Sequence, residues 1–270
     1  MISKPLLEDS TSPLLNSRPL ELYVFIDPNC HDCWQLQPIL RRLQLDYERY
    51  FTLRVILRTS LTSLNGTCNQ QLDQCDTIQH PAFPSIAIKA AEFQGKRAGF
   101  RFISKLFEYL YLKNENVNTF DVLLTIAKSV NLDVDEFTRD FHSKNVHRAL
   151  QIDLYMAREM EVIEAPTFVF FNGNIEDEGL KISGLYSYHI YEQIIEELLG
   201  HSIFPDTPPP LEQLFQRFDL LATKEVADIY QTSEQLVERE LKKRVLQQSL
   251  ERITFNNTTM WKRKKQSVMH

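Results

Sequence analysis

Two cysteines separated by two residues, placed directly after a short apolar run, constrain this chain more than any other feature. Residues 22–26 are apolar and rich in β-branched and aromatic side chains, which is typical of a buried parallel strand. Residues 27–29 interrupt this strand, and apolar residues at helical spacing then predict a helix over about residues 32–49. Cys30 and Cys33 therefore fall at a helix N-terminus, where free backbone N–H groups and the helix dipole stabilise a thiolate.

A second motif lies far along the chain, where Ala165 and Pro166 precede a β-rich run over residues 167–171. A C-x-x-C motif between a strand and a helix, combined with such a proline, resembles the thioredoxin superfamily. That resemblance implies a cis peptide bond before Pro166 and a loop that packs beside Cys30. The separation between Cys33 and Pro166 is too long for plain thioredoxin. It fits the variant with a helical insert, so the chain resembles the DsbA family.

The cysteines have two other interpretations. Instead of a redox pair, Cys30 and Cys33 could be incidental thiols of the core. Alternatively, they could bind zinc, with Cys68 and Cys75 as the other two of four ligands. Six residues separate Cys68 from Cys75, whereas paired zinc ligands stand two to four residues apart. We therefore predict no metal site. We expect Cys68 and Cys75 to be ordinary thiols in a polar loop, or a pair that oxidises under stress.

Composition excludes several classes of function. The chain has 270 residues, enough for one large domain or two modest ones. It contains only 7 glycines and has neither a P-loop nor a dinucleotide fingerprint, so no cofactor is predicted. The formal net charge of −6 favours neither nucleic acid nor anionic membranes as partners.

The first residues carry no sign of export. Residues 1–18 include Lys4, Glu8 and Asp9 and lack the apolar segment of a secretory signal. No segment is apolar for long enough to span a bilayer. We therefore expect a cytoplasmic protein whose thiols are mostly reduced, which disfavours an oxidase of secreted proteins.

Hydrophobic periodicity outlines the elements after the first helix. Residues 51–57 alternate as a second strand, which predicts a right-handed strand–helix–strand unit. Apolar stripes over residues 84–160 predict five helices, and we interpret these stripes as core. A short strand over residues 180–183 and a helix over about 187–199 complete the thioredoxin-like part.

A proline-rich run suggests where this part ends. Residues 201–210 contain four prolines, which act as a stiff spacer. We predict a flexible arm over residues 1–18 and a DsbA-like thioredoxin domain over residues 19–204, with its helical insert over about residues 60–160. A C-terminal domain then covers residues 205–270. The predicted fold class is α/β, thioredoxin-like, followed by this small second domain.

The C-terminal domain has a pattern of its own. Three predicted helices precede a hairpin around Asn256 and Asn257, which looks like a winged-helix α+β arrangement. The domain holds 11 Lys and Arg residues against 9 Asp and Glu residues. However, Glu234, Glu238 and Glu240 begin the helix that would read DNA, and carboxylates there repel the phosphate backbone. We therefore do not expect a nucleic-acid partner.

The combination of these parts is similar to one family, the SpxH (YjbH) adapter proteins of Gram-positive bacteria. The resemblance rests on Leu22-Tyr-Val-Phe-Ile-Asp-Pro28, on Cys30-x-x-Cys33-Trp34 and on Glu164-Ala-Pro-Thr-Phe168. It implies an adapter that binds the redox-sensing transcription factor Spx and presents it to the protease ClpXP. Members often carry a His- and Cys-rich segment before the first strand. Residues 1–18 contain neither residue type, so zinc or oxidant sensing by such a segment does not carry over.

Two functions from different classes remain. An adapter requires a binding surface and no enzyme activity, and its cysteines are then secondary or regulatory. A cytosolic thiol–disulfide oxidoreductase instead requires Cys30 as nucleophile, Cys33 as resolving thiol and Pro166 to hold the substrate backbone. His31, when protonated, favours the Cys30 thiolate or is simply an exposed histidine, whereas Asp32 opposes the thiolate. The two functions coexist if oxidation of the cysteines changes the affinity of the adapter for its client.

Overall fold

A computed structural model describes residues 19–59, 79–172, 179–255 and 258–264. The predicted arm over residues 1–18 lies outside these ranges, as do Cys68, Cys75 and the predicted turn at Asn256 and Asn257.

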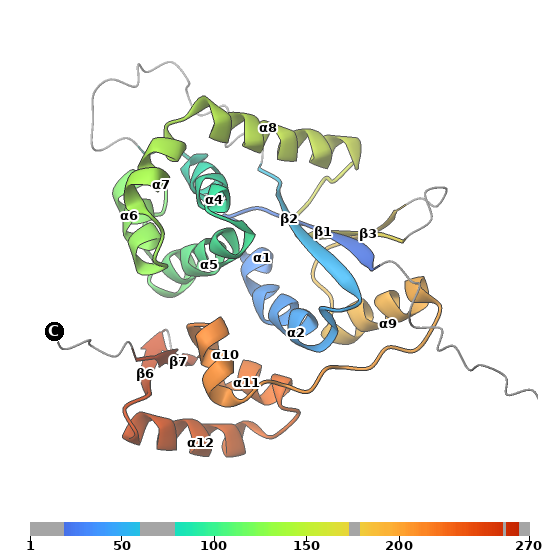
Figure 1. Ribbon diagram of the computed structural model, residues 1–270, viewed down its shortest axis with the longest axis vertical. Helices are drawn as coiled ribbons and strands as arrows, with labels where there is room; N and C mark the ends of the chain where they lie inside the picture. Colours follow the sequence, from blue (N-terminus) through green and yellow to red (C-terminus); the bar gives the residue numbers. More distant parts are fainter. Residues whose placement is uncertain (1–18, 60–78, 173–178, 256–257, 265–270) are drawn as a thin grey trace, which may run out of the picture.

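The larger of two sheets contains the two strands that flank the dithiol motif. It has the order β2-β1-β3-β4, with β1 parallel to β2 and antiparallel to β3, and β3 antiparallel to β4 (Figure 1). In the central register Val24 lies opposite Val55 on one side and Phe168 on the other. The strands are β1 (Leu20–Ile26), β2 (Phe51–Leu57), β3 (Thr167–Phe171) and β4 (Leu180–Ser183). The pairing of β1 with β2 confirms the predicted strand–helix–strand unit.

Helices cover both faces of this sheet. Side chains alternate along β1, so Leu22 and Val24 enter the main core, whereas Tyr23 and Phe25 face a smaller one. The main core also contains apolar side chains of α2 and α9, and the smaller core contains Ala157 of α8. Figure 1 shows α8 on one side of the sheet and α2 with α9 on the other. The helices are α1 (His31–Gln35), α2 (Gln37–Tyr47), α8 (Lys144–Glu159) and α9 (Tyr188–Leu199).

The single helix predicted over residues 32–49 is two helices, and that prediction was wrong in this respect. The break falls at Leu36, the cap between α1 and α2. Pro38 explains it, because proline has no backbone N–H to donate and is tolerated only in the first turn of a helix, where it lies in α2. The short α1 therefore holds the cysteines at its start, whereas the longer α2 packs apolar side chains into the main core.

Helices make up most of the described chain between β2 and β3, where the sequence predicts a helical insert. Phe102, Phe107 and Phe137 are fully buried there and join the main core. Directly after α5, the chain continues into a short π-helical segment, η2. The elements are α4 (Phe83–Phe93), α5 (Lys96–Phe107), η2 (Glu108–Leu112), α6 (Phe120–Ser129) and α7 (Val134–Phe141), followed by α8.

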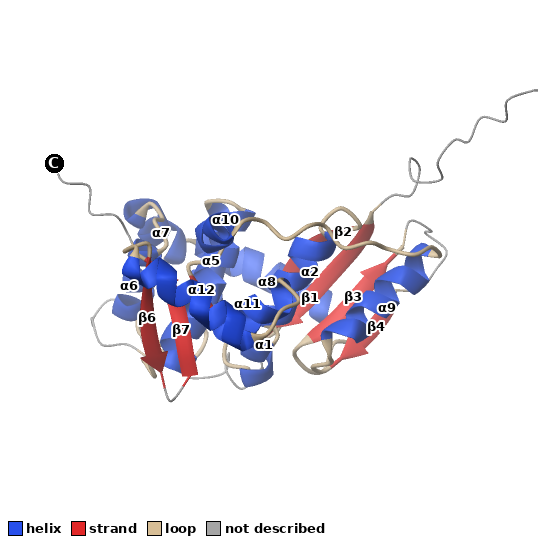
Figure 2. Cartoon of the chain, turned by 90° about the horizontal axis from the view of Figure 1, so that it is seen from below, coloured by secondary structure: helices blue, strands red, loops and turns tan. Residues whose placement is uncertain are grey.

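Among its described residues, the C-terminal part has three helices and a second sheet, which pack around Trp261 and Leu241. The sheet is antiparallel, in the order β5-β7-β6, and Figure 2 shows the two sheets at opposite ends of the molecule. The winged-helix comparison stays a prediction. No helix in the described ranges is both long and apolar enough to cross a membrane. The elements are α10 (Leu211–Arg217), β5 (Leu220–Ala222), α11 (Thr223–Ile229), α12 (Glu234–Leu246), β6 (Leu250–Phe255) and β7 (Thr258–Arg263).

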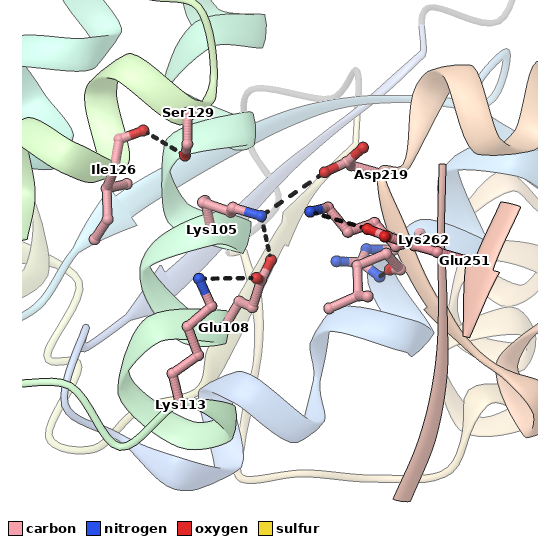
Figure 3. Close-up of polar contacts among 10 residues, drawn as sticks. Lys105, Glu108, Lys113, Ile126, Ser129, Asp219, Glu251 and Lys262 are labelled. Atoms are coloured by element: carbon pink, nitrogen blue, oxygen red, sulfur yellow. Dashed lines mark hydrogen bonds and ion pairs between the residues drawn. The ribbon is translucent and has the colours of Figure 1, made fainter. Parts of the chain in front are cut away.

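A buried lysine at the end of α5 holds the C-terminal part against the thioredoxin-like part (Figure 3). The Lys105 Nζ lies 2.6 Å from the Glu108 Oε2 and 3.7 Å from the Asp219 Oδ2 of the C-terminal part. Lys113 approaches the other oxygen of Glu108 at 3.5 Å. Both Lys105 and Glu108 are buried, so each depends on the other for compensation of its charge.

Removing one member of this buried pair should destabilise the protein more than removing an exposed one. In Lys105→Met, the Glu108 carboxylate stays buried with only the more distant Lys113 as partner. We expect the free energy of unfolding to fall by about 3 kcal/mol. The double variant Lys105→Met/Glu108→Met should recover most of this loss, because no uncompensated charge remains. Urea unfolding followed by circular dichroism measures both.

The matched control is Lys262→Met, since Lys262 pairs with Glu251 at 3.4 Å in a more exposed setting (Figure 3). This variant should cost less than about 1 kcal/mol. Equal losses in Lys105→Met and Lys262→Met would contradict a special role for the buried pair.

Candidate functional site

The two cysteines of the C-x-x-C motif meet at the start of α1. Cys30 is the N-cap residue, and its Sγ accepts a hydrogen bond from the Cys33 backbone N–H at 3.3 Å. Both residues are free thiols; Cys30 is partly exposed, whereas Cys33 is fully buried. The chain therefore presents one accessible sulfur and keeps the other behind it. The side-chain cap satisfies one of the N–H groups that a helix start leaves without a partner.

The proline loop before β3 lies against the accessible sulfur. The Cys30 thiol donates a hydrogen bond to the Ala165 carbonyl oxygen at 3.1 Å, and the Ala165–Pro166 peptide bond is cis. The hydroxyl of Thr167 holds the loop by donating to the Glu164 carbonyl at 2.8 Å. The three residues singled out in the sequence, Cys30, Cys33 and Pro166, therefore lie together.

The two thiols differ strongly in acidity. A hydrogen bond from the Cys33 side chain lowers the pKa of the Cys30 thiol to about 7, against the opposing effect of burial. Backbone N–H groups of Cys33 and Asp32 lower this pKa further, and the Asp32 carboxylate raises it, as the sequence predicts. The pKa of the Cys33 thiol is raised, first by its hydrogen bond with Cys30 and then by burial. Near neutral pH, Cys30 is thus partly a thiolate, whereas Cys33 is a protonated thiol.

Three aromatic rings form a wall beside the dithiol. Trp34 stacks on Tyr111 with ring centroids 5.2 Å apart, and His31 meets both rings edge-on at 5.4 Å. The His31 side chain is 55% exposed and lies 4.0 Å from Asp32. The Tyr111 hydroxyl is buried without a hydrogen-bond partner among the described residues, and burial raises its pKa.

Sequence reasoning missed Tyr111. It belongs to η2, some eighty residues from the cysteines along the chain, and only the fold brings it there. Its position within a run of apolar and aromatic residues gave a signal for core packing and none for the dithiol.

Within the described ranges, no group of three or more His, Cys, Asp or Glu side chains is arranged to hold a metal ion. The chemistry that the site's geometry supports is thiol–disulfide exchange, since it combines an acidic accessible thiol with a buried partner thiol.

The lowered pKa of Cys30 should be visible in its reaction with iodoacetamide. The rate of alkylation, followed by peptide mapping, should rise with pH through a midpoint near 7, because only the thiolate reacts. In Cys33→Ala the hydrogen bond is lost, so the midpoint should move up toward the ordinary range near 8.5. Cys33→Ser retains an O–H donor and should move it less. A midpoint near 8.5 in the unaltered protein would show that Cys33 does not stabilise the thiolate.

Comparisons with known proteins show similarity over nearly the whole chain. The family model described as thioredoxin matches residues 23–193. The "ClpXP adapter protein SpxH" of Bacillus subtilis is 38% identical over 267 residues, which cover 91% of this chain and 89% of that protein. The protein of the same name from Shouchella clausii is 40% identical over 275 residues, covering 94% of this chain and 92% of the relative.

Solved structures agree on the fold of the thioredoxin-like part. A protein from Nitrosomonas europaea has a TM-score of 0.53 at 15% identity, covering 68% of this chain and 97% of its own. A variant of α-DsbA1 from Wolbachia pipientis has a TM-score of 0.50 at 15% identity, covering 70% and 92%. The dithiol motif, the DsbA-type fold and the similarity over nearly the entire length lead to one conclusion: this chain belongs to the SpxH family, a branch of the thioredoxin superfamily.

Proposed function

We propose that this protein is an adapter that binds the transcription factor Spx and promotes its degradation by the ClpXP protease. The observation that carries this proposal is the similarity to proteins named ClpXP adapter protein SpxH, which covers more than 90% of this chain. It includes the C-terminal part, which the thioredoxin family model does not match. An adapter has to contact a client and a protease at once, and a chain whose thioredoxin-like and C-terminal parts are each built on an apolar core offers a surface on each part.

We propose a division of the chain near residue 204, into a thioredoxin-like client-binding domain and a C-terminal domain. In support, one apolar cluster contains the larger sheet and the inserted helices, and another contains the smaller sheet. The proposed partners are a transcription factor and a protease, both of which act inside the cell, so we also infer a cytoplasmic location.

The direct test is degradation of purified Spx by ClpXP with and without this protein. We expect the protein to raise the rate by about tenfold at low client concentration, because tethering the client to the protease raises its effective concentration. Degradation of an unrelated ClpXP substrate should not change. If Spx degradation is equally fast without the protein, the adapter proposal is wrong.

The variant Cys30→Ala/Cys33→Ala shows whether the thiols take part. Acceleration by this variant as well as by the unaltered protein would make the cysteines dispensable for delivery. Acceleration by the unaltered protein alone would tie delivery to the dithiol. Comparison of the oxidised with the reduced protein then tests whether a Cys30–Cys33 disulfide changes the affinity for Spx.

A second candidate function is thiol–disulfide exchange, and the specific observation in its favour is the lowered pKa of Cys30 beside the Ala165 carbonyl. The Cys30 thiolate attacks one sulfur of a substrate disulfide, forms a mixed disulfide and releases the first substrate thiolate. The Cys33 thiol then loses its proton and attacks the Cys30 sulfur, which releases the second substrate thiolate. The substrate gains two electrons, and the chain ends with a Cys30–Cys33 disulfide. The Pro166 loop would hold the substrate backbone.

Reduction of insulin by dithiothreitol tests this second function. We expect the unaltered protein to shorten the time before insulin precipitates, and Cys30→Ala to abolish the effect because the nucleophile is absent. In a separate reaction without dithiothreitol, the reduced Cys33→Ala protein should stop at a mixed disulfide with insulin, because no second thiol releases it. Identical time courses for the unaltered protein and Cys30→Ala would remove the oxidoreductase function.

A further inference from the structure

The outer face of α8 carries two large apolar side chains that are mostly exposed. Its inner face is fixed: Asp153 accepts a hydrogen bond from the Leu57 backbone N–H at 2.8 Å and pairs with the buried Lys89. On the outer face, the side chains of Ile152 and Tyr155 are 60% and 59% exposed. Figure 1 shows α8 at the edge of the molecule, on the side of the larger sheet away from the C-terminal part. The face is therefore a rigid and accessible surface.

Charges flank these apolar side chains in a definite order. Arg148, Ile152, Tyr155 and Glu159 follow one another at intervals of four, three and four residues, so they form one line along the helix, here called the α8 stripe. Arg148 and Glu159 are both exposed, and neither forms an ion pair with any described residue. The stripe therefore presents a cation, an apolar centre and an anion.

Stability of the helix does not account for this order. The first turn of α8 contains no acidic residue and begins with Lys144, whereas its last residue is Glu159. A helix dipole favours anions at the N-terminus and cations at the C-terminus, so Lys144 and Glu159 both oppose it. Arg158 follows the dipole, but it lies about a quarter of a turn from the centre of the stripe.

The stripe is complementary to itself. The pair Arg148 and Glu159 and the pair Ile152 and Tyr155 share one midpoint, between residues 153 and 154. A two-fold axis through that point brings a second α8 alongside in the opposite direction. Arg148 of each copy then faces Glu159 of the other, and each Ile152 faces a Tyr155. An unrelated partner would have to match this order independently, whereas a second copy matches it by symmetry.

We propose that two copies of this chain form a two-fold dimer through antiparallel contact of their α8 stripes. The composition suits such an interface, because tyrosine and arginine are enriched at interfaces and an apolar centre with charged ends is their usual layout. A contact made mainly by one helix face is small, so the dimer should be weak and reversible. This inference does not depend on the adapter proposal.

Charge reversal provides the test. Sedimentation velocity over a range of concentrations should show a reversible dimer of the full chain. Arg148→Glu and Glu159→Arg should each weaken the dimer by at least about tenfold, because symmetry converts both ion pairs into like-charge contacts. The double variant Arg148→Glu/Glu159→Arg restores opposite charges and should recover the original dissociation constant. Arg158→Glu, about a quarter of a turn from the stripe centre, is the matched control and should weaken the dimer much less than either stripe reversal.

Loss of the dimer in these variants can be distinguished from unfolding of the protein. Glu159→Arg introduces the charge that the helix dipole favours in the last turn, whereas Arg148→Glu lies in the second turn, where the dipole is weak. The thermal unfolding of both variants should therefore occur near or above the original temperature. A monomer at every concentration would overturn the proposal, as would a dimer that ignores the single reversals or is not restored by the double one. If the reversals change Spx binding in a protein that stays monomeric, the stripe is a client surface and the dimer is wrong.

Discussion

The antiparallel pairing of β3 with β1 is the constraint on which the rest of the structure depends. It places Pro166 beside Cys30, although 135 residues separate Cys30 from the Ala165 carbonyl that its thiol contacts. The long excursion between β2 and β3 must therefore leave the sheet and return to it. The inserted helices make this possible by packing on the same core as β1, with Phe102 and Phe107 buried among its side chains. The dithiol site and the helical insert thus have one physical cause.

Helix α2 joins the C-terminal part to the rest of the chain. Helix α2 contributes Leu40 and Leu43 to the main core and Leu45 to the C-terminal core, so a single helix belongs to both. Arg41 adds a hydrogen bond to the Leu220 carbonyl at 3.2 Å and an ion pair with Glu225 at 3.0 Å. The proline-rich run is accordingly no free spacer, since the Asp206 N–H donates to the Asp46 carbonyl at 2.8 Å. These contacts hold the two parts of the chain against each other.

Periodicity and local motifs were enough to predict the strands other than β5, the inserted helices and the helix start at Cys30. What they missed depends on contacts between distant segments or on very short elements. Strand β5 has only three residues and is defined by its pairing with β7, so no alternation marks it. Tyr111 lies in an ordinary apolar run and reaches the dithiol only because η2 ends beside α1. The break before α2 was predictable, because Pro38 was visible in the sequence.

The position of the α8 stripe decides what a dimer would mean for an adapter. Helix α8 covers one face of the larger sheet, whereas α2 and the C-terminal part lie beyond the other face. Contact through α8 therefore leaves the C-terminal part of each copy uncovered. Two clients and two C-terminal domains would then be held in one particle. A client released from one copy would meet the second at a raised effective concentration, and this gain needs no new contact with the client. Weak self-association is thus sufficient to strengthen delivery, provided that both copies engage at the same time.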